Sequence, residues 1–88
     1  MSMIALPERL LISDASATLA RLIPLLQAAE VLDLDASALQ QLDSSAVAVL
    51  LACKREAGLL GRPLQITGAS PKLKQLAQLY GVESLLGL

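Results

Sequence analysis

Three consecutive polar residues, Asp43, Ser44 and Ser45, stand where a polar connection gives way to the most apolar segment of the chain. The pattern predicts a helix that starts near Ser44, with Asp43 as its N-cap. A helix N-terminus presents free backbone N–H groups and the positive end of the helix dipole, so a serine hydroxyl there could carry a phosphate. Phosphorylation would add about 1.5 to 2 negative charges, enough to switch a docking surface. The simpler interpretation is that all three residues cap the helix, and spacing alone favours it.

Other side chains that could do chemistry are few. The sequence has no histidine and no glycine-rich phosphate loop, and its single cysteine, Cys53, lies in an apolar context. These absences argue against a serine hydrolase, a nucleotide hydrolase, a cysteine-based metal cage and an internal disulfide. Asp33 and Asp35 would share one face of a strand, but no third metal ligand accompanies them, so a polar strand end is the simpler interpretation. We therefore expect no catalytic residue, no metal and no cofactor.

Length and composition restrict the classes of partner. The 88 residues predict one domain over residues 1–88, and a hydrophobic content of 55% predicts that it is folded. Seven Lys and Arg balance eight Asp and Glu, and Tyr80 is the only aromatic residue, so nucleic-acid binding is not expected. The longest uncharged apolar run, 44–53, is shorter than the roughly 20 residues of a transmembrane helix. We expect a cytoplasmic chain without direct membrane insertion.

The elements that must position Asp43 and the serines begin with two short apolar stretches. Within residues 3–12 these stretches predict one bent strand or two short edge strands. Apolar residues at helical spacing over 19–26 then predict a first helix, with Ser13 or Asp14 as its N-cap. Pro24 should kink the last turn of this helix or end it early.

The rest of the chain alternates strands and helices. We expect a strand at 31–35, a connection at 36–42 and then a helix from Ser44 to about 58, which Gly58 and Gly61 end. A strand at 63–67 follows. A third helix is opened by Ser70 and Pro71 and followed by Gly81, and an apolar tail at 82–88 is expected to pack back onto the sheet. Such alternation predicts an α/β fold, with a small mixed or parallel sheet and helices packed against it.

Several segments carry a family resemblance. The strand Val31-Leu32-Asp33-Leu34, then Leu42-Asp43-Ser44-Ser45-Ala46, then Val49-Leu50-Leu51, resembles the core signature of STAS domains, the sulfate-transporter and anti-sigma-factor-antagonist family. Gly61-Arg62-Pro63-Leu64 and Gly68 also look like the family's passage from helix to strand. The resemblance implies a STAS-like fold over the whole chain, and it places the family's key hydroxyl on Ser44.

Within the family, the C-terminal part is most similar to the small STAS subunits of Mla-type phospholipid ABC transporters. That likeness lies in Pro71, Leu73, Leu76, Ala77, Tyr80-Gly81-Val82 and Leu85-Leu86. It implies a non-catalytic regulatory subunit that binds the transporter's ATPase, within an ATPase–permease complex at the inner membrane, in phospholipid transport that maintains outer-membrane lipid asymmetry. The expected partner-binding residues are Asp43, Ser44, Ser45, Ala46, Val47 and Lys54.

An alternative from the same family stays open. In anti-sigma-factor antagonists the hydroxyl that corresponds to Ser44 is phosphorylated by a partner kinase, which would make this chain a signalling switch. Ala46 stands where the family motif has glycine, and this departure argues against a kinase that needs close approach to the backbone. In either role, an apolar face made for a partner would let the isolated chain form homodimers.

Overall fold

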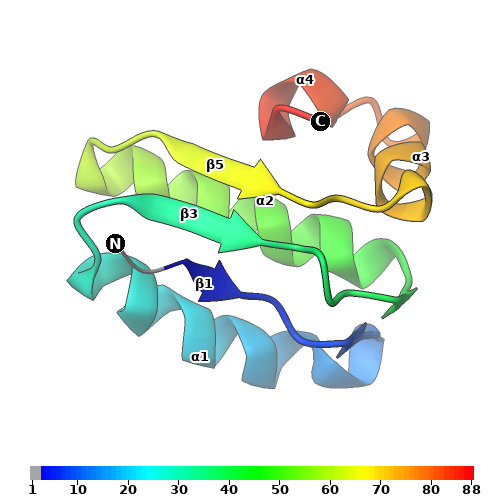
Figure 1. Ribbon diagram of the computed structural model, residues 1–88, viewed down its shortest axis with the longest axis horizontal. Coiled ribbons are helices and arrows are strands. Elements are labelled where there is room, and N and C mark those ends of the chain that lie inside the picture. Colours follow the sequence, from blue (N-terminus) through cyan, green and yellow to red (C-terminus); the bar gives the residue numbers. More distant parts are fainter. Residues whose placement is uncertain (1–2) are drawn as a thin grey trace.

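The computed structural model describes residues 3–88, which fold into two small parallel sheets and a set of helices (Figure 1). The larger sheet has the order β1–β3–β5, with β1 at Ile4–Ala5, β3 at Leu32–Asp35 and β5 at Leu64–Thr67. All of its strand pairs are parallel. The α/β prediction is therefore confirmed, and the sheet is parallel rather than mixed.

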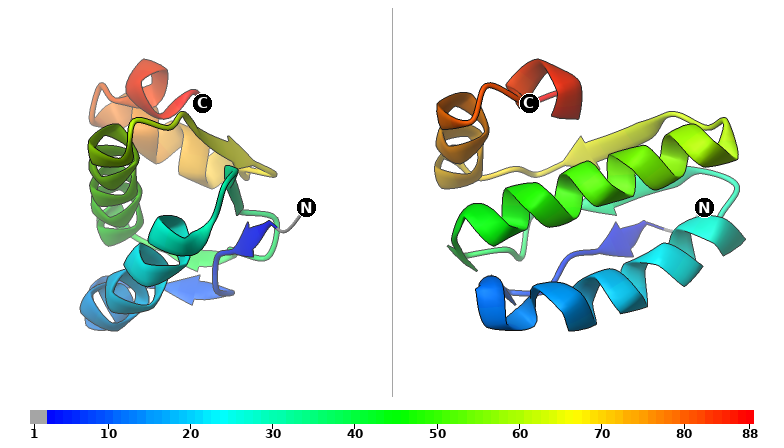
Figure 2. Two further views of the ribbon diagram at one scale, coloured as in Figure 1. Left: turned by 90° about the vertical axis from the view of Figure 1, so that its left-hand side faces the viewer. Right: turned by 180° about the vertical axis from the view of Figure 1, so that it is seen from behind.

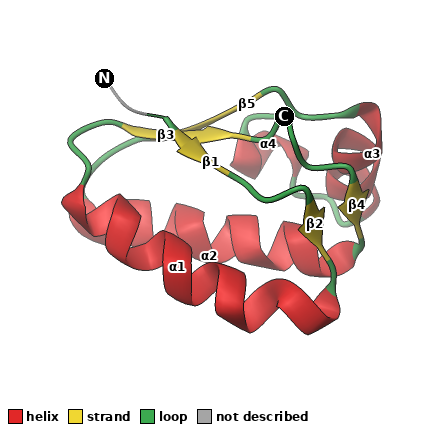
Figure 3. Ribbon diagram, turned by 60° about the horizontal axis from the view of Figure 1, so that its bottom comes forward, coloured by secondary structure: helices red, strands yellow, loops and turns green. Residues whose placement is uncertain are grey.

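The two long helices cover the same face of this sheet. Helices α1 (Ala15–Ala28) and α2 (Ser44–Leu60) lie next to each other on one side of the strands, to the left of the sheet in the left view of Figure 2 and beneath it in Figure 3. The register sets Leu32 beside Leu64 and Leu34 beside Ile66, and the β3 residues Leu32 and Leu34 are buried under the helices. Alternation along β3 sends Asp33 and Asp35 to the opposite face. That face carries no helix in the part of the chain that the structure describes.

The second sheet pairs β2 (Arg9–Leu10) with β4 (Gln41–Leu42) at the end of the molecule where both long helices begin (Figure 3). A 3-10 turn over Ile12–Asp14 links β2 to α1, and Asp43 alone separates β4 from α2. The parallel pairing therefore sets the two helix N-termini side by side. We predicted either one bent strand or two short strands near the N-terminus, and the structure has two.

Helix α1 does not end at Pro24. It continues for four residues, to Ala28, so the expectation of an early end is wrong. The physical reason is that Leu22 and Leu26, on either side of the proline, are both fully buried and hold the chain against the core. Of the two predicted N-cap positions, Asp14 is the N-cap residue of α1, although its carboxylate makes no capping bond to this helix, and Ser13 lies inside the 3-10 turn.

Helix α2 extends past the first glycine that was expected to end it. Gly58 is helical, and the helix ends at Gly61, whose φ of 68° is left-handed. The Arg62 N–H then donates to the Ala57 carbonyl at 3.0 Å, which satisfies a carbonyl of the last turn. Because Ala57 is buried against the core, the turn that contains Gly58 is held in helical form.

The C-terminal elements pack on helices rather than on the sheet. Helix α3 (Pro71–Leu79) starts as predicted, with the Ser70 hydroxyl accepting from the Leu73 N–H at 3.2 Å. Residues 82–88 were expected to form a tail on the sheet, but they contain a short helix, α4 (Glu83–Leu86), which packs mainly against α2 and α3. The expectation that 36–42 is only a connection is wrong as well, because it contains β4.

Candidate functional site

Asp43 closes the start of α2 and also reaches the start of α1. One carboxylate oxygen, Oδ1, accepts from the Ser45 N–H at 2.8 Å, which confirms the predicted N-cap. The other, Oδ2, accepts from the Ile12 N–H at 3.1 Å, across a sequence distance of 31 residues. One side chain therefore binds the N-terminal ends of two neighbouring helical segments. These bonds to the charged form lower the pKa of Asp43, the Ser45 N–H having the larger effect.

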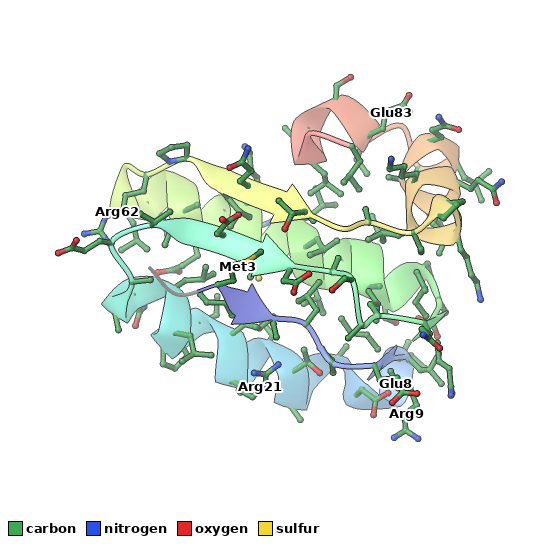
Figure 4. All side chains as sticks on the ribbon, in the orientation of Figure 1. Met3, Glu8, Arg9, Arg21, Arg62 and Glu83 are labelled. Atoms are coloured by element: carbon green, nitrogen blue, oxygen red, sulfur yellow. The ribbon has the colours of Figure 1, made fainter. Side chains whose placement is uncertain are left out.

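Asp14 binds the backbone at the beginning of α1 in a similar way. Its carboxylate accepts from the Leu11 N–H at 3.0 Å and pairs with the Arg9 guanidinium at 2.9 Å. The hydrogen bond from Arg9 is the main reason that the pKa of Asp14 is lowered. Figure 4 shows Arg9 at this end of the molecule. The charge of Asp14 raises the pKa of Asp43 slightly, so the two carboxylates lie within electrostatic reach of each other.

The motif residues after Asp43 face different ways. Ser44 is exposed, whereas Ser45 is 9% exposed and Ala46 is fully buried. Val47 is 3% exposed. Ser44 is thus the motif residue whose side chain is most accessible to another molecule, while Ser45 and Ala46 belong to the inner side of α2.

A shallow groove starts at Ser44 and follows the outer side of α2, which is the side that carries the exposed residues Ser44 and Ala48. Its volume is about 400 Å³. No charged side chain lines it, and the residues that do are Ser44, Val47, Ala48, Leu51, Tyr80 and Val82. A smaller groove of about 160 Å³ runs on the other side of Ala48, between α2 and α1. Ala48 therefore stands between two uncharged hollows, which suit an apolar partner surface better than a polar ligand.

The structure brings only some of the expected partner-binding residues together at this groove. Ser44 and Val47 line it. Asp43 lines neither groove and instead binds the start of α2 through its hydrogen bonds. The half-buried Lys54 lies one turn beyond Leu51 and also lines neither groove. The binding role of all six predicted residues stays a prediction.

Sequence reasoning missed the residues that form the walls of the groove. Tyr80 follows α3 and is 55% exposed, and Val82 precedes α4. More than half of the Tyr80 surface remains open to solvent although the residue is large and mostly apolar. The available signal was that it is the only aromatic residue in the chain. Its position opposite α2 depends on how α3 packs, which local sequence does not report.

The other candidate side chains have separate positions. Asp33 and Asp35 lie on the helix-free face of the sheet, and the Asp35 carboxylate accepts from the Ser37 N–H at 3.0 Å. Cys53 is fully buried on the inner side of α2, and burial raises the pKa of its thiol to about 11. Over residues 3–88, no group of three or more His, Cys, Asp or Glu side chains could hold a metal ion. None of the helices in that range is both long and apolar enough to cross a membrane.

Comparison with known proteins bears on this motif directly. The family described as "Mlab, STAS domain" matches residues 1–87. No curated protein matches the chain significantly. The family match includes β3, the Asp43-Ser44-Ser45-Ala46 motif, α2 and the groove wall at Tyr80 and Val82. The chain therefore belongs to the STAS domain family, in the group that bears the description Mlab.

Proposed function

We propose that this chain is a non-catalytic STAS subunit that binds and regulates the ATPase of a Mla-type phospholipid ABC transporter. In this role it resides in the cytoplasm, at the inner membrane through its partner, and contributes to lipid asymmetry of the outer membrane. The family match over residues 1–87 supports the class of complex. The observation that carries the docking site is that the motif serine, Ser44, is exposed at one end of an uncharged groove.

The groove suits a protein partner for two physical reasons. Its lining combines the hydroxyl of Ser44 with apolar side chains, so a partner could exclude water from it without leaving a charge unpaired. Its walls come from α2 and from the α3–α4 segment, which pack on each other. A surface assembled on packed helices is preorganised, which lowers the entropic cost of docking.

Ser44→Glu tests this placement by adding a charge to the lining of the proposed contact. An unpaired charge buried in an interface costs about 2–5 kcal/mol, so the affinity for the ATPase should fall by at least roughly 30-fold. The experiment captures the ATPase–permease complex with the tagged chain and then titrates the purified ATPase by calorimetry. Gln75→Glu is the matched control, because it adds the same charge on α3 at an exposed position outside both grooves.

Ser44→Ala separates docking from phosphorylation. This variant keeps the groove uncharged and removes the hydroxyl, so ATPase binding should stay within about threefold of wild type. If Ser44→Glu binds as tightly as wild type, the proposed position of the contact is wrong. Capture of a serine kinase instead of an ATPase, with phosphate on Ser44, would replace the transporter role by the signalling role.

A further inference from the structure

The outer side of α2 forms a stripe of exposed and half-buried residues along the whole helix. Ser44, Ala48, Arg55 and Leu59 are exposed, and Leu51 and Ala52 are half-buried between them. These positions recur at helical spacing, so they share one side of the helix. The stripe is accompanied by the uncharged groove beside α3 and by the smaller groove beside α1.

When two copies of this stripe are placed antiparallel, a large side chain of each copy faces a small side chain of the other. Consider a second copy laid antiparallel so that Leu51 of one chain faces Ala48 of the other. This pair joins the larger, half-buried Leu51 of one copy to the small, exposed Ala48 of the other. A two-fold axis repeats the contact, and matching of ridges to hollows is how helices pack closely.

The charges at the two ends of the stripe are complementary as well. Two carboxylates lie at this end of the molecule, Asp43 at the start of α2 and Asp14 at the start of α1, and over residues 3–88 only Asp14 forms an ion pair, with Arg9. Arg55 is exposed in the second half of the helix, where Lys54, and Arg62 just after the helix end, add positive charge that exceeds the negative charge of Glu56. Arg62 lies at the opposite end of the molecule from Arg9 (Figure 4). In the antiparallel register, Arg55 of each copy faces Ser44 and the adjoining Asp43 of the other.

We propose that the isolated chain forms a two-fold symmetric homodimer through antiparallel packing of α2 on α2, with Ala48 near the axis. A contact of about a tenth of the 5062 Å² surface on each copy would bury about 1,000 Å² in total. That area is at the lower limit of specific interfaces, so the dimer should be weak and reversible, with a dissociation constant of roughly 0.1 mM.

The homodimer would cover Ser44 and Ala48, the residues that the proposed function assigns to ATPase docking. Self-association and docking would therefore exclude each other, and the dimer would be a form of the free subunit that cannot bind the ATPase. The proposal itself does not depend on the identity of the docking partner, because the dimer is measured with the chain alone.

Sedimentation velocity of the purified chain from about 10 µM to 1 mM tests the proposal. Wild type should show a monomer–dimer equilibrium. Ala48→Arg puts a bulky charge where the helices approach most closely and should abolish the dimer. Arg55→Glu brings a third carboxylate to the acidic end of the partner and should weaken the dimer at least about 10-fold. Lys72→Glu makes the same charge change on α3, outside the stripe, and should leave the equilibrium unchanged.

Two results would overturn the proposal. A chain that remains monomeric up to 1 mM has no such dimer, and a dimer that Ala48→Arg leaves intact uses another surface. A dimer that Ala48→Arg breaks but Arg55→Glu does not weaken contradicts the antiparallel register. Each of these results leaves the ATPase titration with Ser44→Glu to decide the proposed function separately.

Discussion

Helix α2 has an inner side and an outer side made of similar small and apolar residues. On the inner side Ala46, Leu50 and Cys53 are fully buried beneath the sheet. On the outer side Ala48 is exposed, and Leu59 is 79% exposed. The comparison teaches that apolar residue type does not separate core from contact surface in this helix. What separates them is which side faces the sheet and α1, and variants matched across the two sides can test this.

The largest expected effect is on stability, from one leucine truncation on each side. Leu50→Ala leaves a cavity in the core and should lower the free energy of unfolding by about 2–5 kcal/mol. Leu59→Ala removes the same atoms from a largely solvated position and should change it by less than about 0.5 kcal/mol. Urea denaturation followed by circular dichroism measures both. Equal losses would show that Leu59 is buried in solution, for example by self-association.

Thiol reactivity should differ strongly between the two sides. Cys53 is buried with its pKa raised to about 11, so at pH 8 its thiolate fraction is about 100-fold below that of an ordinary cysteine. A cysteine at an exposed position, Ala48→Cys, should react with a disulfide reagent at an ordinary rate. Native Ala48→Cys should therefore show one fast equivalent and one slow one, and denaturation should make both fast. A fast reaction of wild type would mean that Cys53 is accessible.

Asp43 lies at the start of both sides of α2, where it caps this helix and also binds the turn in front of α1. Asp43→Ala removes both hydrogen bonds and should lower the melting temperature by about 4–8 °C, as expected when a small domain loses a helix cap. Asp43→Asn keeps an oxygen that can accept from Ser45, so its loss should be smaller. Thermal unfolding measures both, and a melting temperature of Asp43→Ala equal to wild type would contradict the bridging role.

The smallest expected effect is on the acid dependence of stability. The pKa of Asp43 is lowered by folding, so its stabilising contribution is complete above its unfolded pKa of about 4. That contribution is lost as the pH falls through the lower folded pKa. Asp43→Asn cannot titrate, so its stability should fall less than that of wild type between about pH 5 and pH 2.5. Parallel curves of urea midpoint against pH would show that Asp43 does not contribute.

Local signals predicted most of the elements. Asp43 before α2 and Ser70-Pro71 before α3 are capping patterns whose hydrogen bonds form within a few residues, so sequence alone placed both helix starts. The residues that were expected to end helices predicted the helix ends less reliably. Pro24 and Gly58 are unfavourable in a helix by themselves, but buried neighbours hold both segments helical. Pairing of the two-residue strand β4 with β2 joins residues about 30 positions apart, which no local pattern reports.

The candidate site also combines features that local sequence predicts with features that depend on long-range packing. The sequence by itself determined the α/β alternation, the capped start of α2 and the family motif with its serine, because these depend on short-range spacing and residue type. Only the tertiary structure decided that Ser44 is exposed while Ser45 and Ala46 are buried, and that Asp43 also binds Ile12. It also decided that Tyr80 and Val82 complete a groove on α2. The physical reason is that exposure and groove walls arise where distant segments pack against each other.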